Sequence, residues 1–402
     1  MKVVHVNTHD SGGAAVAAYR LHSSLLGQGI DSRFLVLFNS GKFPDVDRFE
    51  PQKRSFVSKK IKTRLRGNPA LEIQRFLLEN AKVEMFSSPD TLYDLTTSPL
   101  IREADLIHLH WVSNFIDYST FFKSTKKPVV WTFHDENPLL GGCHYSRDAQ
   151  FLSPAMMGME NEYRDRKMTS LKSLAQLDII CPSDWMRQKV GDSFYSAYRI
   201  HKIFYGLEEN GFQRIEQMEA RRRLNINHEH TVLCAVASDL KTYRKGFDII
   251  LSLKDLICSD GKTTLLLAGE MPEVSMPGNV VQLGKLDDKD KLNLVYAASD
   301  ALLFPSRQDN LPNVLLESLF CGTPALAFSV GGVAEIIQHG VNGLLADEVS
   351  VESFGELIKK FLTMKDTFKR SEIRDNAVQK FSMKNQVNRV INVYKERVPA
   401  NP

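Results

Sequence analysis

One carboxylate, Glu317, stands in a stretch whose neighbouring side chains are almost all apolar. The stretch from Pro305 to Phe328 reads PSRQDNLPNVLLESLFCGTPALAF, and at the helical period Glu317 falls between Phe320 and Cys321. This pattern predicts a buried helix without a polar face. Because a buried carboxylate is costly without hydrogen-bond donors, either a cation of the protein or the hydroxyl groups of a ligand must supply them. The sequence of this segment leaves both interpretations open.

The flanks of this helix indicate a site for anionic groups. Pro312 suits the first helical position and Gly322 suits the residue just past the end, so we expect a helix over residues 312–321. Its free amides at Asn313 and Val314 would face the preceding loop. The positive end of a helix suits phosphate or sugar oxygens, and the loop residues beside it are Asp309, Asn310 and Leu311.

A basic turn follows a strand-like run in the second half of the chain. The segment ASDLKTYRKGFDIIL places Arg244 and Lys245 just before a helical pattern. Cations held there could neutralise a diphosphate that gains charge as it leaves. Because Arg244 and Lys245 are adjacent, we expect their side chains to point in different directions. A solvated basic turn is the alternative interpretation.

Two strand ends in the first half carry further candidates. In WTFHDENPLLGGCHY, His134 and Asp135 stand at a predicted strand end, where His134 could donate a hydrogen bond to a sugar or phosphate. A His beside an Asp also suits acid–base work, and anchoring of the following loop is the alternative. Gly12 and Gly13 follow the first strand and would let a ligand approach backbone amides. The third glycine of a dinucleotide fingerprint is absent, which disfavours an NAD-dependent dehydrogenase.

Metal binding is not predicted. Several possible ligands occur in the first half, but no compact ligand-pair spacing recurs among them. These residues are His108, His110, His134, Cys143 and His144.

The elements that must position these residues follow an alternating rhythm. Short apolar runs rich in β-branched residues alternate with helical patterns, which predicts parallel sheets covered by helices. The predicted strands of the first half are 3–7, 33–38, 106–111, 129–133 and 179–182, and those of the second half are 232–237, 264–269, 280–284, 301–304 and 325–328. The polar segment 206–220 is the expected linker. Ligands of such sheets bind beyond the carboxyl ends of the strands, so two facing domains would form one cleft.

Composition limits the class of protein. The 402 residues have a net charge of +3 and 25% charged residues, which does not favour a general nucleic-acid binder. A basic cluster over residues 48–66 suits either an anionic membrane surface or a solvated helix and loop. Five widely spaced cysteines indicate reduced core thiols and a cytoplasmic protein. Since no apolar run approaches the ~20 residues needed to cross a bilayer, we expect any membrane contact to be peripheral.

Taken together and in order, these segments resemble the retaining glycosyltransferases of family 4. The matching pieces are GGAAVAAYRLHSSL, ADLIHLHW, WTFHDENPLLGGCHY, the RKGFD turn and PSRQDNLPNVLLESLFCGTPALAFSVGGVAEIIQHGVNGLL. The resemblance implies an α/β fold of two Rossmann-like parallel-sheet domains facing a central cleft, the GT-B architecture. It implies an acceptor-binding domain over residues 1–205, a nucleotide-sugar-binding domain over 206–385, and a final helix over 386–402 that crosses back to the first domain.

The resemblance also implies a role for each matching residue. Glu317 would bind the ribose hydroxyls of the donor, and Asp309, in place of the more usual glutamate, would lie near the transferred sugar. Lys245 would bind phosphate. Arg244 would substitute for an arginine that the family normally places ahead of this lysine.

The remaining matches concern the rest of the donor. His134 would lie near the donor sugar, and Gly12 and Gly13 would border the diphosphate and the acceptor. The residues expected to lie by the base or along the helix start are Gly284, Lys285, Leu286, Asn310, Leu311, Asn313 and Val314.

The sequence therefore predicts a retaining hexosyltransferase that moves a sugar from a nucleoside-diphosphate donor to the hydroxyl of a glycan or lipid-linked glycan. We expect no metal and no cofactor besides the donor substrate. The expected setting is cell-surface polysaccharide synthesis in the cytoplasm, with contact at the inner membrane face through residues 48–66 left open. Two alternatives remain: a nucleotide-sugar epimerase of the same architecture and a non-catalytic nucleotide-sugar-binding subunit.

Overall fold

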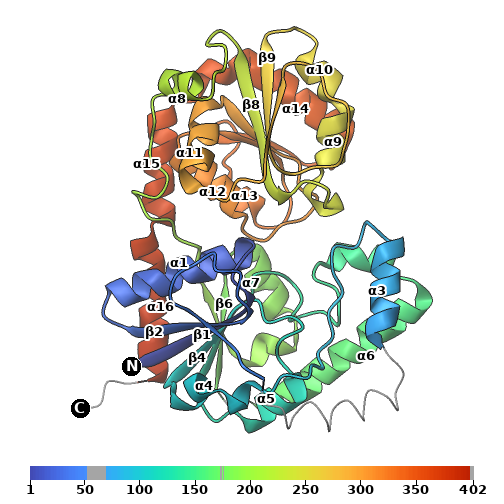
Figure 1. Cartoon of the computed structure of the whole chain (residues 1–402), viewed down its shortest axis with the longest axis vertical. Coiled ribbons are helices and arrows are strands. Elements are labelled where there is room, and N and C mark those ends of the chain that lie inside the picture. Colours follow the sequence, from blue (N-terminus) through green and yellow to red (C-terminus); the bar gives the residue numbers. More distant parts are fainter. Residues whose placement is uncertain (52–68, 173, 175, 399–402) are drawn as a thin grey trace. The chain divides into compact units, whose positions relative to one another are not determined.

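The structure is a computed structural model that describes residues 1–51, 69–172, 174 and 176–398 (Figure 1). The chain forms two compact units. The N-terminal unit comprises Met1–Phe204 together with the chain from Gln386 onward, and the C-terminal unit comprises Tyr205–Asn385. Each unit is an α/β structure with its own sheet.

The N-terminal unit contains a seven-stranded sheet in which all neighbouring strands are parallel. Its order is β3-β2-β1-β4-β5-β6-β7. The strands are β1 (Lys2–His9), β2 (Asp31–Phe38), β3 (Val46–Arg48), β4 (Leu106–Leu109), β5 (Val129–Thr132), β6 (Leu177–Cys181) and β7 (Arg199–Lys202). Its helices are α1 (Gly13–Gly27), α3 (Pro69–Glu79), α4 (Pro99–Glu103), α5 (Tyr118–Ser124), α6 (Pro154–Leu171) and α7 (Asp184–Gly191).

The C-terminal unit contains a six-stranded parallel sheet with the order β10-β9-β8-β11-β12-β13. The strands are β8 (Thr231–Asp239), β9 (Thr263–Glu270), β10 (Val280–Gly284), β11 (Ala301–Phe304), β12 (Ala325–Phe328) and β13 (Gly343–Ala346). Its helices are α8 (Gln217–Arg223), α9 (Phe247–Ser252), α10 (Lys254–Cys258), α11 (Lys289–Ala298), α12 (Asn313–Phe320), α13 (Val333–Ile336), α14 (Val351–Met364) and α15 (Arg370–Phe381).

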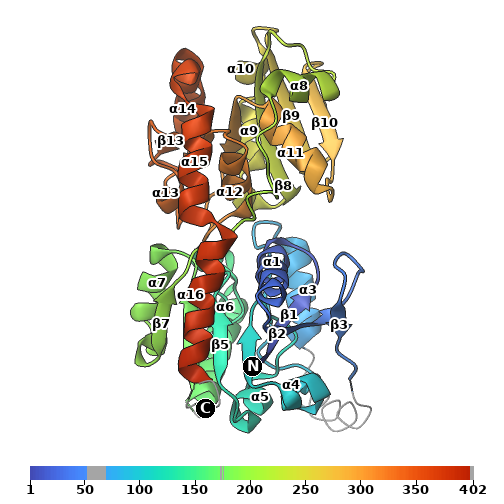
Figure 2. The same ribbon diagram turned by 90° about the vertical axis from the view of Figure 1, so that its left-hand side faces the viewer.

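The last helix, α16 (Met383–Arg397), belongs to the N-terminal unit from Gln386 onward. Figure 2 shows it in red beside the strands of the N-terminal sheet. The hydroxyl of Tyr394 lies 2.5 Å from Nδ1 of His108 on β4, and the Arg397 guanidinium donates to the buried Asp178 on β6. Long-range polar contacts therefore attach this helix to the sheet.

The chain order reverses at one place in each sheet. In the N-terminal sheet it reverses between β1 and β4, and in the C-terminal sheet between β8 and β11. In open α/β sheets, ligands bind beyond the carboxyl ends of the strands at such a reversal. A ligand site is therefore expected at the loops after β1 and β4 or at the loops after β8 and β11.

The predicted fold class, two Rossmann-like parallel-sheet domains, is confirmed. The strands predicted at 280–284, 301–304 and 325–328 have these bounds in the structure. The strands β3 and β7 were missed because their sequences, VDR and RIHK, are largely polar, and β13 was missed because its sequence, GLLA, has only two strongly apolar residues.

The segment 206–220, predicted as a linker, folds onto the C-terminal unit instead. Its Phe212 side chain is 1% exposed, and the Arg374 guanidinium donates to the backbone carbonyls of Phe212 and Glu209. Helix α8 begins within the same segment, at Gln217. The polar composition of the segment reflects its surface position rather than a free connection.

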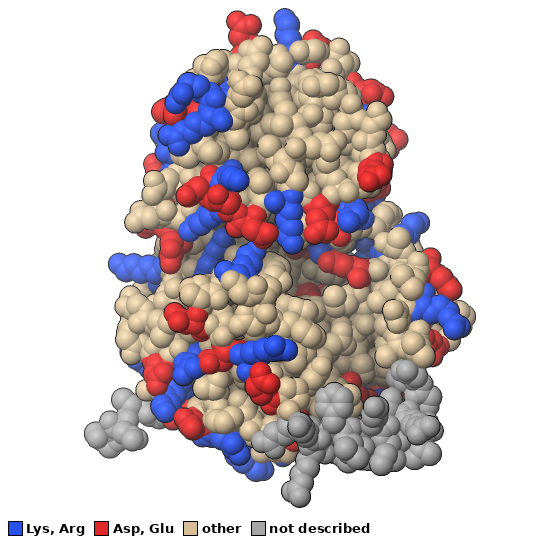
Figure 3. Space-filling view, viewed as in Figure 1, with Lys and Arg blue, Asp and Glu red and all other residues tan. Residues whose placement is uncertain are grey.

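The cysteines and the surface agree with the composition. All five cysteines are free, and all except Cys258 are buried, which confirms the prediction of reduced thiols. On the face shown in Figure 3, Lys and Arg side chains lie among Asp and Glu side chains. Among the helices of the described residues, none has the length and apolar character needed to cross a bilayer. Most of the basic cluster 48–66, from residue 52 onward, lies outside the described residues.

Candidate functional site

The strand reversal in the C-terminal sheet brings together two cations and one carboxylate. Lys245 Nζ lies 2.7 Å and Arg244 Nη1 lies 3.1 Å from Oδ2 of Asp309, and all three residues are buried or half-buried. Arg244 and Lys245 follow β8, and Asp309 follows β11. The expectation that the two adjacent cations point in different directions is therefore wrong. The short 3₁₀ turn Tyr243–Lys245 lets both side chains reach one oxygen.

The charges of this group determine its protonation. Burial alone would raise the pKa of Asp309, but the neighbouring charges of Lys245 and Arg244 outweigh burial and lower the pKa below its usual value. Asp309 is therefore ionised at neutral pH, and its single negative charge faces two positive charges. The group has a net charge of +1 and suits an anionic ligand.

Two glycines allow the loops of this group to meet. Gly246 has a φ of +73°, and a Cβ there would lie 2.0 Å from the carbonyl oxygen of Pro305. Gly331 has a φ of +56°, and a Cβ there would lie 1.8 Å from the carbonyl oxygen of Asp309. A side chain at either position would push the loop after β8 or after β12 away from the loop after β11.

Helix α12 carries Glu317 into the interior of the C-terminal unit. Glu317 is 6% exposed, and the hydroxyl of Tyr296 on α11 donates to its Oε2 at 3.2 Å. The pKa of Tyr296 is raised by burial and by the Glu317 charge, so the phenol keeps its proton and stays a donor. The sequence predicted the burial of Glu317 but missed Tyr296, which lies 21 residues away on an adjacent helix.

The start of α12 follows Asp309, the carboxylate that pairs with Arg244 and Lys245, by a few residues. The helix begins at Asn313, and Pro312 is the N-cap in an extended conformation instead of the first helical residue. Asn310 is 1% exposed, and its backbone N–H donates to Asp309 Oδ1 at 3.1 Å. The remaining predicted residues are Leu311, which is 3% exposed, and the partly buried Asn313 and Val314.

The residues predicted to border the base lie at the end of the edge strand β10. Gly284 has a φ of +65°, and Lys285 Nζ lies 3.7 Å from Oε1 of Glu270 on β9. Leu286 follows and is partly buried. Strands β9 and β8 stand between β10 and β11, so these residues belong to a different part of the same sheet edge from Asp309.

In the N-terminal unit, His134 follows β5 and is partly exposed. Its Nε2 lies 3.0 Å from Nδ1 of His110. The neighbouring Asp135 accepts hydrogen bonds from the His144 ring at 2.6 Å and from the Trp111 indole at 2.8 Å. Asp135 therefore anchors the loop, and the suggested acid–base pairing of Asp135 with His134 is replaced by pairing with His144.

Two glycines were predicted to border a ligand after β1. Gly12 is the N-cap of α1 with a φ of +88°, and Gly13 is the first residue of that helix. Both are exposed. They lie in the N-terminal unit with His134, whereas the other predicted site residues lie in the C-terminal unit.

Within the described residues, one histidine group has ring nitrogens close enough to share a metal ion. It consists of His5, His108 and His110, whose nitrogens lie within 4.8 Å of one another. The sequence analysis did not include His5. Cys143, His134 and His144, which it did consider, are not part of this group.

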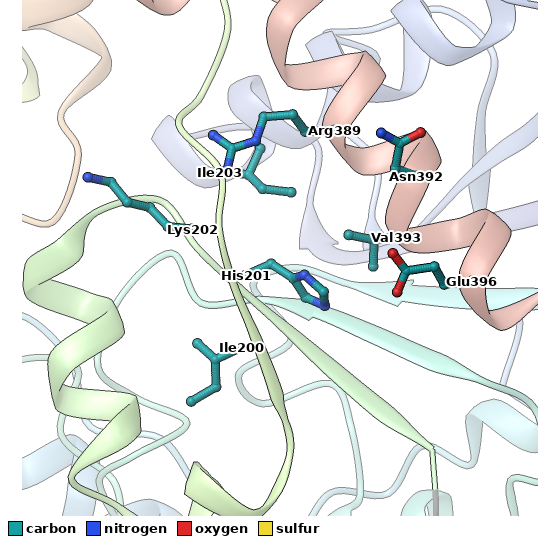
Figure 4. A pocket seen from close by; sticks show the side chains of 8 residues that line it. All are labelled: Ile200, His201, Lys202, Ile203, Arg389, Asn392, Val393 and Glu396. Carbon is teal, nitrogen blue, oxygen red and sulfur yellow. The ribbon is translucent and has the colours of Figure 1, made fainter.

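A separate cleft of about 350 Å³ lies between β7 and α16 in the N-terminal unit. Figure 4 shows the side chains of the strand and the helix meeting across it. Its lining residues are Ile200, His201, Lys202, Ile203, Arg389, Asn392, Val393 and Glu396. None of the predicted site residues is among them.

Known proteins share this architecture and part of the sequence. Residues 216–380 match the family model of glycosyl transferases group 1. The putative colanic acid biosynthesis glycosyl transferase WcaC of Escherichia coli K12 is 26% identical over 366 residues, which cover 84% of this chain and 85% of WcaC.

Two solved structures share the fold over nearly the whole chain. Sucrose-phosphate synthase from Thermosynechococcus elongatus aligns over 100% of both chains with a TM-score of 0.72 and 17% identity. HepE from Anabaena, solved in complex with UDP-glucose, aligns over 98% of this chain and 100% of its own with a TM-score of 0.69 and 16% identity. The chain therefore has the two-sheet GT-B fold, and most of its C-terminal unit, residues 216–380, is similar to the glycosyl transferases group 1.

Proposed function

We propose that this protein is a retaining glycosyltransferase that moves a sugar from a nucleoside-diphosphate sugar to an acceptor hydroxyl. The observation that carries the proposal is the buried group of Arg244, Lys245 and Asp309 at the strand reversal of the C-terminal sheet. A net positive group beyond the carboxyl ends of parallel strands suits a diphosphate. The family match covers these residues.

Each residue of the C-terminal group has a proposed role. Lys245 and Arg244 stabilise the charge that develops on the departing diphosphate, and Glu317 accepts hydrogen bonds from the ribose hydroxyls. Asp309 holds the two cations and lies near the transferred sugar. Glu317 is a buried carboxylate that accepts a hydrogen bond from Tyr296 on Oε2, and an ionised carboxylate, which only accepts hydrogen bonds, suits the two hydroxyls of a diol.

The other predicted residues complete the proposed donor site. His134 lies near the donor sugar, and Gly12 and Gly13 border the diphosphate and the acceptor. The residues proposed to contact the base or the phosphates through their backbone are Gly284, Lys285, Leu286, Asn310, Leu311, Asn313 and Val314. In this scheme the N-terminal unit binds the acceptor and the C-terminal unit binds the donor.

The proposed reaction needs no enzyme nucleophile. The acceptor oxygen attacks the anomeric carbon on the face of the leaving group while the bond between that carbon and the diphosphate oxygen breaks. The proton of the acceptor hydroxyl passes to the diphosphate, so the product keeps the anomeric configuration of the donor. We propose that the reaction uses neither a metal ion nor a cofactor besides the donor.

The relatives suggest a setting. WcaC is described as a colanic acid biosynthesis enzyme, so we propose an acceptor in cell-surface polysaccharide or lipid-linked glycan synthesis. We also propose that the transferred sugar is a hexose and that the protein is cytoplasmic. Residues 48–66 would make peripheral contact with an anionic membrane.

The test begins with donor binding. Nucleoside-diphosphate sugars are screened for thermal stabilisation, starting with UDP-glucose because HepE was solved with it. A ligand at one hundred times its dissociation constant stabilises the folded state by about 2.7 kcal/mol, which shifts the unfolding temperature by several degrees. If no nucleotide sugar stabilises the wild type, the proposal fails.

Turnover distinguishes transfer from its alternatives. The stabilising donor is incubated with and without glycan acceptors, with and without EDTA, and the products are examined by mass spectrometry and NMR. We expect product only when acceptor is present, and we expect that product to keep the anomeric configuration of the donor. EDTA should not change the rate of product formation. Product from donor alone would indicate an epimerase, and binding without turnover would indicate a binding subunit.

Lys245→Ala should lower kcat more than donor affinity, whereas Lys359→Ala, at an exposed ion pair on α14, should change neither.

A further inference from the structure

The cleft between β7 and α16 lies within the N-terminal unit, and ion pairs hold its two walls together. The Arg397 guanidinium on α16 donates to the buried Asp178 on β6. Arg199 on β7 lies 3.6 Å from the same carboxylate and also pairs with Glu396 on α16. The helix is therefore fixed against the last strand of the sheet, and the cleft of about 350 Å³ is large enough for a ligand.

The floor of this cleft is apolar. Figure 4 shows the His201 side chain of β7 reaching toward α16, and Ile203 lies on the same face because it is two residues further along the strand. Ile203 is 2% exposed and Val393 on α16 is 4% exposed. Ile200 has its side chain on the opposite face of the sheet, so it borders the cleft through its backbone.

The outer edge of β7 borders the cleft. The strand is the last in the sheet order, so no strand of the described residues pairs with its outer side. In a parallel pair, alternate residues direct both backbone groups toward the neighbouring strand. The Ile203 N–H donates to the carbonyl oxygen of Cys181 on β6 at 3.0 Å, so the residues in phase with Ile203 face β6. Ile200 is out of phase with Ile203 and directs its N–H and C=O to the outer edge.

Two polar side chains of α16 at this cleft have unused hydrogen-bonding capacity. The Arg389 guanidinium and the Asn392 amide are exposed, and neither group has a hydrogen bond or an ion pair with a described residue. The acid of the cleft, Glu396, is already paired with Arg199. The cleft therefore offers a guanidinium without a counter-ion, which is the group best suited to bind a carboxylate.

We propose that this cleft binds an extended acidic peptide segment of a partner protein, which adds to the open edge of β7. The backbone of the segment exchanges hydrogen bonds with the N–H and C=O of Ile200, and a carboxylate of the segment pairs with Arg389. In strand addition of this kind, backbone hydrogen bonds supply affinity and contacts of alternate side chains supply specificity. The apolar floor of Ile203 and Val393 receives one such side chain. This binding does not depend on the proposed sugar transfer.

A second copy of this chain fits the same edge less well. The sequence of β7 is RIHK, so antiparallel pairing of β7 with β7 of another copy places Arg199 opposite Lys202. Like charges directly opposite each other destabilise a strand pair. Charged residues on an edge strand also prevent unselective strand addition. The same two cations favour a segment that carries acids.

The first measurement compares two fluorescein-labelled hexapeptides with amidated carboxyl ends on the whole chain. One alternates glutamate with valine and the other alternates lysine with valine, so the two differ in the sign of their charge. Fluorescence anisotropy gives the dissociation constants. We expect the glutamate peptide to bind at least about tenfold more tightly than the lysine peptide. No binding of the glutamate peptide, or equal binding of the two, overturns the proposal.

A charge reversal at the exposed Arg389 tests the proposed carboxylate contact. In Arg389→Glu we expect the glutamate peptide to bind at least about tenfold more weakly and the lysine peptide to bind more tightly than in wild type. Lys395→Glu makes the same change of charge at an exposed position of α16 outside the lining of the cleft, and it should leave both affinities unchanged. Equal weakening in the two variants would mean a general attraction of acids to the surface and overturns the proposal.

The backbone contact is tested on the wild-type chain. In an extended peptide the N–H groups of alternate residues point to opposite edges, so methylating the glutamate nitrogens blocks one edge and methylating the valine nitrogens blocks the other. We expect one of these two methylated peptides to bind at least about tenfold more weakly and the other to keep its affinity. Equal affinities of the two overturn strand addition and would mean that the cleft binds a carboxylate alone. Amide hydrogen exchange at Ile200 should slow in the complex, and unchanged exchange there overturns the proposed position of the peptide.

Discussion

At the scale of single residues, Asp309 neutralises part of the charge that the proposed diphosphate site provides. Its Oδ2 accepts hydrogen bonds from both Lys245 and Arg244. A buried and a half-buried cation without a counter-ion would be costly, so this carboxylate stabilises the loops before any anion binds. An incoming diphosphate would take over part of that role.

Asp309→Asn removes the negative charge and keeps the shape of the side chain. We expect the free energy of unfolding without ligand to fall by about 3 kcal/mol, because the buried Arg244 and the half-buried Lys245 lose their counter-ion. A nucleoside diphosphate should restore more stability to this variant than it adds to wild type. Thermal unfolding with and without UDP measures the difference.

The matched control is Asp248→Asn, which removes an acid paired with Arg307 on the half-exposed rim of the same loops. UDP should raise the unfolding temperature of Asp248→Asn by the same amount as it raises that of wild type. Equal shifts in Asp309→Asn and wild type would show that Asp309 does not compete with the diphosphate for the two cations.

Glu317 is the second residue whose substitution should change nucleotide binding. Glu317→Ala should weaken nucleotide binding at least a hundredfold, because hydrogen bonds to a charged group contribute about 1.5–3 kcal/mol each and the ribose offers two hydroxyls. The free energy of unfolding should fall by only about 1–3 kcal/mol, the cost of leaving the Tyr296 hydroxyl without its acceptor. Calorimetric titration with UDP and denaturant unfolding measure the two effects. Strong destabilisation with unchanged nucleotide affinity would mean that Glu317 is a structural group.

At the scale of elements, helix α6 holds the loop that follows β5. Glu160 on α6 accepts the backbone N–H groups of Gly141, Gly142 and Cys143 at 2.6, 2.6 and 2.9 Å. Lys167, two turns further along the helix, donates to the carbonyl oxygens of Asn137 and Leu140 and to the Asn137 side chain. One helix therefore satisfies both the donors and the acceptors of the loop that carries His134.

Glu160→Gln should release the loop amides. A neutral amide oxygen accepts more weakly than a carboxylate, and its NH₂ group cannot accept at all, so we expect a loss of about 1–3 kcal/mol in the free energy of unfolding. Amide hydrogen exchange at Gly141 to Cys143 should accelerate. Glu162→Gln, at an exposed acid of the same helix, is the control and should leave this exchange unchanged. Equal exchange in both variants would show that the loop is held by other contacts.

At the scale of the whole molecule, the neutral histidines are concentrated in one unit. Burial lowers the pKa of His22 to about 4, of His134 to about 4 and of His108 to about 3, and all three residues belong to the N-terminal unit. The three tryptophans, Trp111, Trp131 and Trp185, also belong to this unit. Tryptophan fluorescence therefore reports on the unit that contains the titrating groups.

We expect the N-terminal unit to lose stability as the pH falls from about 6.5 to 4. In this window the unfolded chain takes up protons on histidines that remain neutral in the folded state, so acidification favours unfolding by up to about 1.4 kcal/mol per pH unit for each such histidine. Denaturant unfolding followed by tryptophan fluorescence at a series of pH values measures the slope. His22→Gln should reduce the slope, and a slope equal to that of wild type would show that His22 does not contribute.

Much of the fold was readable from local sequence pattern. Apolar runs such as 301–304 and 325–328 predict buried parallel strands because their period and their flanking turns are properties of neighbouring residues. The burial of Glu317 was readable for the same reason. The strands β3 and β7 were not, since these short edge strands carry too little apolar surface to mark them.

The site depended on contacts that no local pattern contains. Lys245 meets Asp309 across 64 residues and His5 meets His110 across 105, and only the sheet order places these strands side by side. By itself the sequence determined the two-sheet architecture and the identity of the charged and polar candidates, because those follow from hydrophobic periodicity and residue chemistry. The tertiary structure alone decided which candidates share an oxygen or a proton, because hydrogen bonds and ion pairs depend on distances that strand pairing and close loop contacts set.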